Sequence, residues 1–90
     1  MVGDIGLKAK VTVYPRPEIL DPQGKAIHQS LQRIGFEGVK QVRAGKSFEI
    51  ELSAADANDA REQLDRMCRK LLANTVVEDY AVELLPGEPA

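Results

Sequence analysis

The chain has 90 residues and a mass of 9.9 kDa, the size of one small domain. Its formal net charge is −2, so it lacks the strong positive charge of a typical nucleic-acid-binding domain. A single cysteine, Cys68, excludes an internal disulfide, and a single histidine, His28, argues against a Cys/His zinc site. Residues 1–6 do not resemble a signal peptide, and no apolar stretch approaches the roughly 18 residues of a membrane span. We therefore expect a cytoplasmic protein that binds no membrane.

Alternation of apolar and polar residues predicts a first strand over residues 7–14. The apolar positions are Leu7, Ala9, Val11 and Val13. Pro15 and Pro17 should end this strand, because proline has no N–H to donate to a neighbouring strand.

A helix is predicted to follow from residue 21 to residue 35. Asp21 before Pro22 is typical of a helix start, and Gly35 suits the left-handed position that ends a helix. One apolar stripe runs along it at helical spacing, formed by Ile27, Leu31 and Ile34. Gly24 weakens the first turn, and a close backbone approach there would explain it.

Two further strands, Val39–Ala44 and Ser47–Ser53, are predicted to form a hairpin around Gly45 and Lys46. The second alternates clearly, with inward positions at Phe48, Ile50 and Leu52.

A second helix is predicted from a cap at Asp56 or Ser53 to Asn74, followed by a last strand from Val76 to Leu85. Its apolar face comprises Ala60, Leu64, Met67, Cys68, Leu71 and Leu72. The apolar side of the last strand comprises Val76, Tyr80, Val82 and Leu84.

The order β-α-β-β-α-β predicts the α+β class and a ferredoxin-like split βαβ sandwich. In this fold a four-stranded antiparallel sheet carries both helices on one face.

The helix-free face argues against RNA binding. The first strand places Lys8 and Lys10 opposite Glu49 and Glu51 of its neighbour, where an RNA-binding sheet would carry aromatic residues on a basic background. We expect no nucleic-acid partner.

No catalytic or metal-binding set of residues emerges from the pattern. His28 has no second histidine or paired cysteine, and Cys68 falls on the apolar face of the second helix. We predict no catalytic residue, no metal and no cofactor in this chain.

Three segments together resemble the PurS family, the small subunit of phosphoribosylformylglycinamidine (FGAM) synthase. The first is residues 16–27, containing the specific run LDPQGKA from Leu20 to Ala26; the others are residues 42–46 and 67–80. The similarity runs from about Lys8 to Leu84. Glu18 and Thr75 depart from the family pattern, in which glycine and proline are usual.

The resemblance implies one PurS-like domain over residues 1–90, with flexible ends at 1–6 and 86–90. It implies a non-catalytic adaptor in a three-component amidotransferase of de novo purine biosynthesis. A glutaminase subunit (PurQ) would release ammonia, and a synthetase subunit (PurL) would use it with ATP, Mg and glutamine-derived nitrogen to convert FGAR to FGAM. The adaptor, a homodimer or a dimer of dimers, would bridge them.

We expect the matching segments to supply contacts with partner chains or a second copy. The candidate interface residues are Tyr14, Arg16, Leu20, Asp21, Gln23, Gly24, Lys25, Arg43, Lys46, Asn74, Asp79 and Tyr80. Simple structural roles also explain some residues of these segments: Asp21 as a helix cap, Asn74 as a C-cap and Gly45 as a turn former. The last strand lacks proline before Pro86, so its edge should be paired or covered, which favours a dimer.

Two other functional classes remain open from the residues alone. A regulatory module resembling the ACT domain shares the strand order and would bind an amino acid beside its first β–α turn. A free-standing enzyme is the third possibility, and the lack of a catalytic set counts against it.

Overall fold

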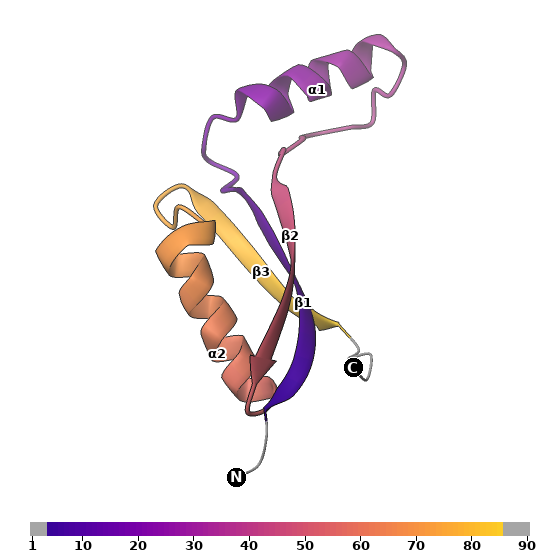
Figure 1. Cartoon of the computed structure of the whole chain (residues 1–90). Helices are drawn as coiled ribbons and strands as arrows, with labels where there is room; N and C mark the ends of the chain where they lie inside the picture. Colours follow the sequence, from indigo (N-terminus) through magenta and orange to yellow (C-terminus); the bar gives the residue numbers. More distant parts are fainter. Residues whose placement is uncertain (1–3, 86–90) are drawn as a thin grey trace.

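The computed structural model describes residues 4–85 (Figure 1). Its elements, in chain order, are β1 (Ile5–Pro15), α1 (Pro22–Arg33), β2 (Lys46–Ala54), α2 (Ala57–Met67), a π-helical turn η1 (Cys68–Leu72) and β3 (Glu78–Leu85). β1 begins at Ile5, inside the stretch 1–6 that we expected to be flexible. Residues 1–3 and 86–90 lie outside the described part.

The sheet has three antiparallel strands in the order β2-β1-β3. Val11 of β1 lies opposite Phe48 on one side and Val82 on the other, so the longest strand occupies the centre. The predicted charge pairing is confirmed: Lys8 Nζ lies 3.2 Å from Glu49 Oε1 and 3.8 Å from Glu51 Oε1.

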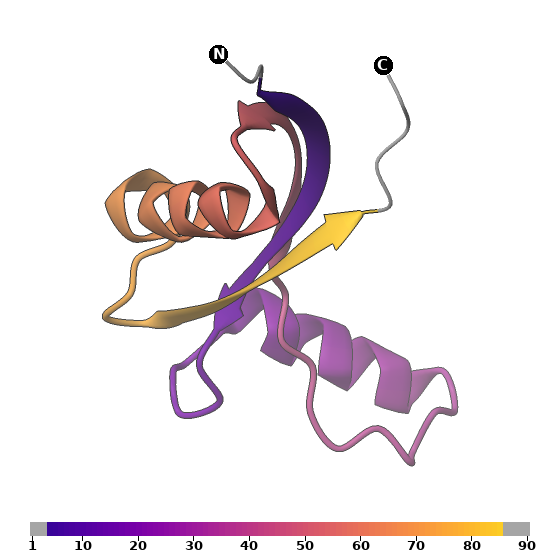
Figure 2. The ribbon, with the colours of Figure 1, turned by 90° about the horizontal axis from the view of Figure 1, so that it is seen from below.

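The core lies between the sheet and α2. Ala9, Val11 and Val13 of β1 are fully buried, as are Leu64 of α2 and Cys68 at the start of η1. The alternation in β1 and the helical spacing in α2 both predicted these positions. Viewed as in Figure 2, α2 lies along one side of the twisted sheet.

The prediction that both helices cover one face of the sheet is wrong for this chain. Helix α1 projects away from the sheet, joined to it by two connecting segments (Figure 1). Residues 16–45, which we call the arm, leave the sheet at the end of β1 and return at the start of β2. The chain therefore measures 59 × 28 × 14 Å, with a radius of gyration of 17.1 Å. A compact 90-residue domain would have a radius of gyration of about 12 Å.

Helix α1 itself begins and ends where the sequence indicated. Pro22 occupies its first turn, and Gly35 has φ +110° just beyond its end. Phe36 N donates to Leu31 O at 2.9 Å, and Gly35 N donates to Gln32 O at 3.2 Å, the paired bonds of a Schellman motif.

The predicted fourth strand, Val39–Ala44, is not formed, and neither is the hairpin around Gly45 and Lys46. The segment does not turn back but runs on into β2, and within residues 4–85 it pairs with no strand. Two hydrogen bonds hold residues 39–44 in that position. His28 Nε2 bonds to Val39 O at 2.8 Å, and Ala44 N donates to Asp21 Oδ2 where the arm joins the sheet.

Helix α2 is capped by Asp56, whose Oδ1 accepts from Asp59 N at 2.8 Å. It ends in η1, whose closing bond runs from Ala73 N to Cys68 O at 2.9 Å. The extra residue of this turn rotates the end of the helix, so Leu71 is 83% exposed, whereas we predicted it on the apolar face.

Strand β3 begins at Glu78, two residues later than predicted. Val76 is 77% exposed and so does not belong to the apolar side of this strand. Asn74 is not the C-cap either: that position is Ala73.

Candidate functional site

The arm leaves the sheet at residue 16 and returns to it at residue 45, and we call this end its base. A hydrogen bond closes the base by linking two segments that are distant in sequence. Asp21 Oδ2 accepts from Ala44 N at 2.7 Å. This bond, with smaller contributions from the main-chain N–H groups of Gly24 and Gln23, lowers the pKa of Asp21 below its usual 3.8. Asp21 stands at the N-cap of α1, as predicted, although its side chain makes no hydrogen bond of capping geometry. Its carboxylate links the segment of the arm that leaves the sheet to the segment that returns to it.

Gly24 lies where this contact is tightest. It is buried, and a Cβ added there would overlap Val42 O and the carboxylate of Asp21. The glycine that weakens the first turn of α1 is thus explained by close backbone approach.

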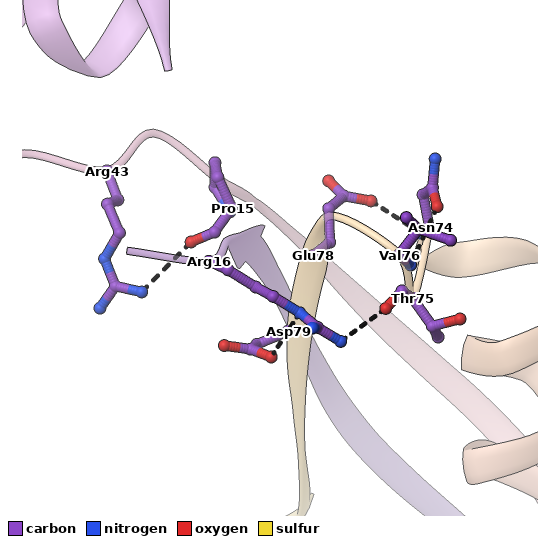
Figure 3. Close-up of polar contacts among 8 residues, drawn as sticks. All are labelled: Pro15, Arg16, Arg43, Asn74, Thr75, Val76, Glu78 and Asp79. Carbon is purple, nitrogen blue, oxygen red and sulfur yellow. Dashed lines mark hydrogen bonds and ion pairs between the residues drawn. The ribbon is translucent and has the colours of Figure 1, made fainter. Parts of the chain in front are cut away.

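Arg43 lies against the end of β1. Its Nη1 donates to Pro15 O at 3.2 Å (Figure 3). Its guanidinium lies 5.0 Å from the ring centroid of Tyr14. Tyr14, Arg43 and Lys46 line an open hollow together with Thr12, Gln41, Gly45 and Ser47. Lys46 Nζ lies 6.0 Å from the ring centroid of Phe48.

Arg16 fastens the arm to the loop before β3. Its Nη2 donates to Thr75 O at 2.6 Å, its main-chain N donates to Val77 O at 3.0 Å, and its Nε lies 3.4 Å from Asp79 Oδ1 (Figure 3). The Nε contact with Asp79 is an ion pair without hydrogen-bond alignment, and Nε itself is buried. Two candidate residues from distant parts of the sequence thus meet here.

Asn74 stabilises the same loop. Its Oδ1 accepts from Val76 N at 3.1 Å, and its main-chain N donates to Glu78 Oε1 at 2.8 Å. The polar side chain therefore forms a local turn, which explains the residue type without a partner.

Tyr80 lies apart from the arm. Its hydroxyl donates to Asp65 Oδ1 on α2, while Asp65 Oδ2 lies 2.6 Å from Arg69 Nη2. The bond to the carboxylate raises the pKa of Tyr80 above its usual 10. We predicted an interface role because nothing local in the sequence required tyrosine, and the structure supplies that requirement on the neighbouring helix.

The remaining candidates are exposed on the arm. Leu20 is 76% exposed, and Gln23 and Lys25 lie on the surface of α1. Lys25 and Leu20 border a smaller hollow between α1 and the returning segment, whose other lining residues include His28 and Lys40. Sequence analysis missed Asp65, Glu78 and Gln41 as partners, because such pairings depend on the folded path.

Within residues 4–85, the candidate residues make contacts between segments of the chain. Within residues 4–85, no three His, Cys, Asp or Glu side chains are grouped so that they could hold a metal ion. Burial raises the pKa of the Cys68 thiol, which disfavours the reactive thiolate. No helix in the described part is long and apolar enough to cross a bilayer.

Comparison with known proteins identifies the family. The family model described as PurS, phosphoribosylformylglycinamidine (FGAM) synthase, matches residues 8–86. The chain belongs to the PurS family. It is a PurS subunit of FGAM synthase.

Relatives and solved structures agree with this assignment. The PurS subunit of Synechocystis is 48% identical over 81 residues, covering 90% of this chain and 81% of that one. The PurS subunit of Bacillus subtilis is 42% identical over 77 residues, covering 86% and 90%. The crystal structure of the PurS subunit from Thermotoga maritima superposes with a TM-score of 0.83 at 33% identity, covering 93% and 97%.

The two departures from the family pattern have clear local settings. Thr75 supplies the carbonyl that accepts from Arg16, a bond that needs no particular side chain at position 75. Glu18 is exposed in the turn between β1 and α1.

Proposed function

We propose that this chain is the non-catalytic adaptor of FGAM synthase in de novo purine biosynthesis, bridging the glutaminase PurQ and the synthetase PurL. The observation that carries the proposal is the similarity to a chain in the PurLQS structure from Thermotoga maritima. The match has a TM-score of 0.80 at 35% identity and covers 89% of this chain and 98% of that one.

The chemistry of the described residues suits this role. Ammonia released into neutral water is mostly protonated and so is a poor nucleophile, which means that a glutaminase and a synthetase must be docked together. An adaptor for that purpose needs a surface whose shape and contact residues fit both partner subunits. ATP, Mg and glutamine would be used by the partner subunits, with none of them bound by this chain.

The proposed adaptor is a homodimer or a dimer of dimers. Its accessible surface is 6608 Å², whereas a compact folded chain of 9.9 kDa exposes roughly 5,200 Å². Apolar side chains contribute to this surplus, including Ile34 at 70% and Phe36 at 56% exposure. A second copy is the most economical cover for such a surface.

Reconstitution tests the adaptor role. Purified PurQ and PurL are assayed for glutamine-dependent FGAM formation with and without this chain, and with ammonium salt replacing glutamine. We expect the chain to stimulate the glutamine-dependent reaction and to leave the ammonia-dependent one unchanged. Full coupling in its absence would refute the proposal. Calorimetric titration with free amino acids should give no heat, whereas an ACT-like module would bind one.

A further inference from the structure

An exposed apolar surface lies outside the arm, at the end of α2. Leu71 of η1 is 83% exposed, and Val76, in the loop before β3, is 77% exposed. The chain passes from one to the other within five residues, so both lie at the corner of the molecule where α2 ends and β3 begins (Figure 1). Neither side chain belongs to the core between the sheet and α2.

The π-helical turn is what places Leu71 outside. An unbroken α-helix would put Leu71 on the same face as Leu64 and Cys68, which are both fully buried. The extra residue of η1 turns Leu71 away from that face. Turns of this kind are rare and occur frequently at functional sites. The exposure of Leu71 is therefore built into the backbone.

The loop that presents Val76 is fixed by several hydrogen bonds. Asn74 Oδ1 accepts from Val76 N at 3.1 Å, and Asn74 O accepts from Val77 N at 3.0 Å. Arg16 Nη2 donates to Thr75 O at 2.6 Å (Figure 3). A loop held in this way loses little conformational entropy when a partner binds to it.

Positive charge accompanies the apolar side chains. Arg66 and Lys70 are exposed near the end of the helix, and neither forms an ion pair within residues 4–85. Arg69, by contrast, lies 2.6 Å from Asp65. The carbonyl groups at a helix end favour cations nearby, which gives Arg66 and Lys70 a structural reason. That reason does not extend to Leu71 or to the charge left without an anion.

We propose that Arg66, Lys70, Leu71 and Val76, which we call the corner, form the docking surface for an acidic surface on one partner subunit. The inference rests on the proposed adaptor function and specifies where on this chain that partner binds. Leu71 and Val76 would enter an apolar depression of the partner, and carboxylates around it would pair with Arg66 and Lys70. Arginine beside a desolvated apolar centre is typical of the residues that carry most of the binding energy in protein interfaces.

Charge favours a different protein over a second copy at the corner. A two-fold contact uses the same patch on both chains. The cations Arg66 and Lys70 of one copy would then face the same cations of the other, and such like-charge contacts oppose association. A carboxylate-rich surface has the complementary charge.

Variants in the reconstituted enzyme test the docking surface. Lys70→Glu and Leu71→Ser are titrated into PurQ and PurL, and the chain concentration that gives half-maximal glutamine-dependent FGAM formation is measured. We expect each variant to raise that concentration at least about tenfold. The matched controls are Arg61→Glu, with the same charge change near the start of α2, and Ile5→Ser, at the opposite end of β1. Both controls should behave as the wild type.

The outcomes separate this proposal from the adaptor function. Wild-type half-maximal concentrations for both Lys70→Glu and Leu71→Ser would overturn the docking surface and leave the adaptor function intact. A wild-type chain that does not stimulate the reaction would overturn both. Melting temperatures measure the helix-end effect of Lys70 separately: if Lys70→Glu lowers only the melting temperature, its role is structural and the docking surface is overturned.

A measurement on the unaltered chain guards against misfolded variants. An amine-reactive acylating reagent is applied to the wild-type chain alone and in the assay mixture with PurL and PurQ. Mass spectrometry gives the labelling of Lys70 relative to that of Lys10, which is exposed on the helix-free face of the sheet. We expect this ratio to fall severalfold in the mixture, because an ammonium group buried in an interface is shielded from the reagent.

An equal ratio with and without the partner subunits would overturn the proposal, whether the corner stays open or a second copy already covers it. Repeating the labelling with PurL alone and with PurQ alone identifies the subunit that carries the acidic surface. The protection of Lys70 should also weaken as the ionic strength rises, because salt screens the attraction between exposed charges.

Discussion

Asp21 and Ala44, twenty-three positions apart, are joined by a hydrogen bond of 2.7 Å from the main-chain N–H to the carboxylate. The bond links the two connecting segments of the arm where they join the sheet. It also gives a physical reason for part of the LDPQGKA segment: Asp21 accepts the bond, and Gly24 leaves room for it.

Acid should weaken the base of the arm. The pKa of Asp21 is lowered in the folded chain, so the carboxylate stabilises the fold above its unfolded pKa of about 3.9. That stabilisation is lost as the pH falls through the lowered pKa. Asp21→Asn should therefore reduce the melting temperature at pH 6 and show a flatter decline between pH 5 and pH 2. Glu62→Gln, on an exposed position of α2, is the control and should follow the wild type. Parallel curves for Asp21→Asn and the wild type would contradict this prediction.

Gly24→Ala should destabilise the chain even though alanine favours helices. The new methyl group would overlap Val42 O and the Asp21 carboxylate, and such overpacking typically costs about 1–3 kcal/mol. Gly38→Ala is the matched control, because a Cβ there meets nothing within 4 Å. Denaturant unfolding measures both variants; equal stability of the two would show that the arm base yields without cost.

Arg16→Ala should loosen the loop before β3. Two of the three contacts come from the side chain, to Thr75 O and to Asp79. The ion pair is partly exposed, at 39% for Arg16 and 46% for Asp79, so we expect the free energy of unfolding to fall by only about 1 kcal/mol. Hydrogen exchange should accelerate at Val77 and Glu78, whose amides bond within this loop. Arg33→Ala, which removes only a bond to Ser30 on the same helix, should leave those amides unchanged.

Tyr80→Phe should cost about 0.5–1.5 kcal/mol, because it leaves Asp65 without the phenol donor. Since the folded pKa of Tyr80 is raised, the stabilisation is present below pH 10 and is lost as the pH rises through the folded value. The difference in unfolding free energy between Tyr80→Phe and the wild type should thus shrink in strong alkali. Asp65→Asn should shift the ultraviolet titration of Tyr80 back towards pH 10, and an unchanged titration would argue against the bond.

The sequence predicts those elements whose signals are local. Alternation in residues 7–14 predicts β1, the Asp-Pro start and Gly35 predict α1, and Asp56 predicts the start of α2. Each depends on contacts within a few residues, so the pattern is sufficient.

The path of the arm depends on contacts that no local pattern contains. Residues 39–44 have the composition of a strand, but whether they turn back at Gly45 is decided by the Asp21–Ala44 bond and by the close approach to Val13. The exposure of Leu71 likewise results from one π-helical turn.

The same limit applies to the candidate site residues. Arg16 and Asp79 were predicted as interface residues, and their ion pair with each other was not predicted. Asn74 and Tyr80 likewise have structural partners, Glu78 and Asp65, that sequence analysis did not find. A role for any of the twelve candidate residues in contacting partner chains stays a prediction.

The arm is attached at two points that are neighbours in the sheet, since Val13 near the end of β1 lies opposite Lys46 at the start of β2. In covalent terms the arm is an insertion of thirty residues into what would otherwise be a plain two-stranded hairpin. Adjacent strands are about 4.8 Å apart, so a tight turn could bridge the gap. The arm could therefore be lengthened, grafted or deleted, in evolution or by protein engineering, without changing the connectivity of the sheet and α2.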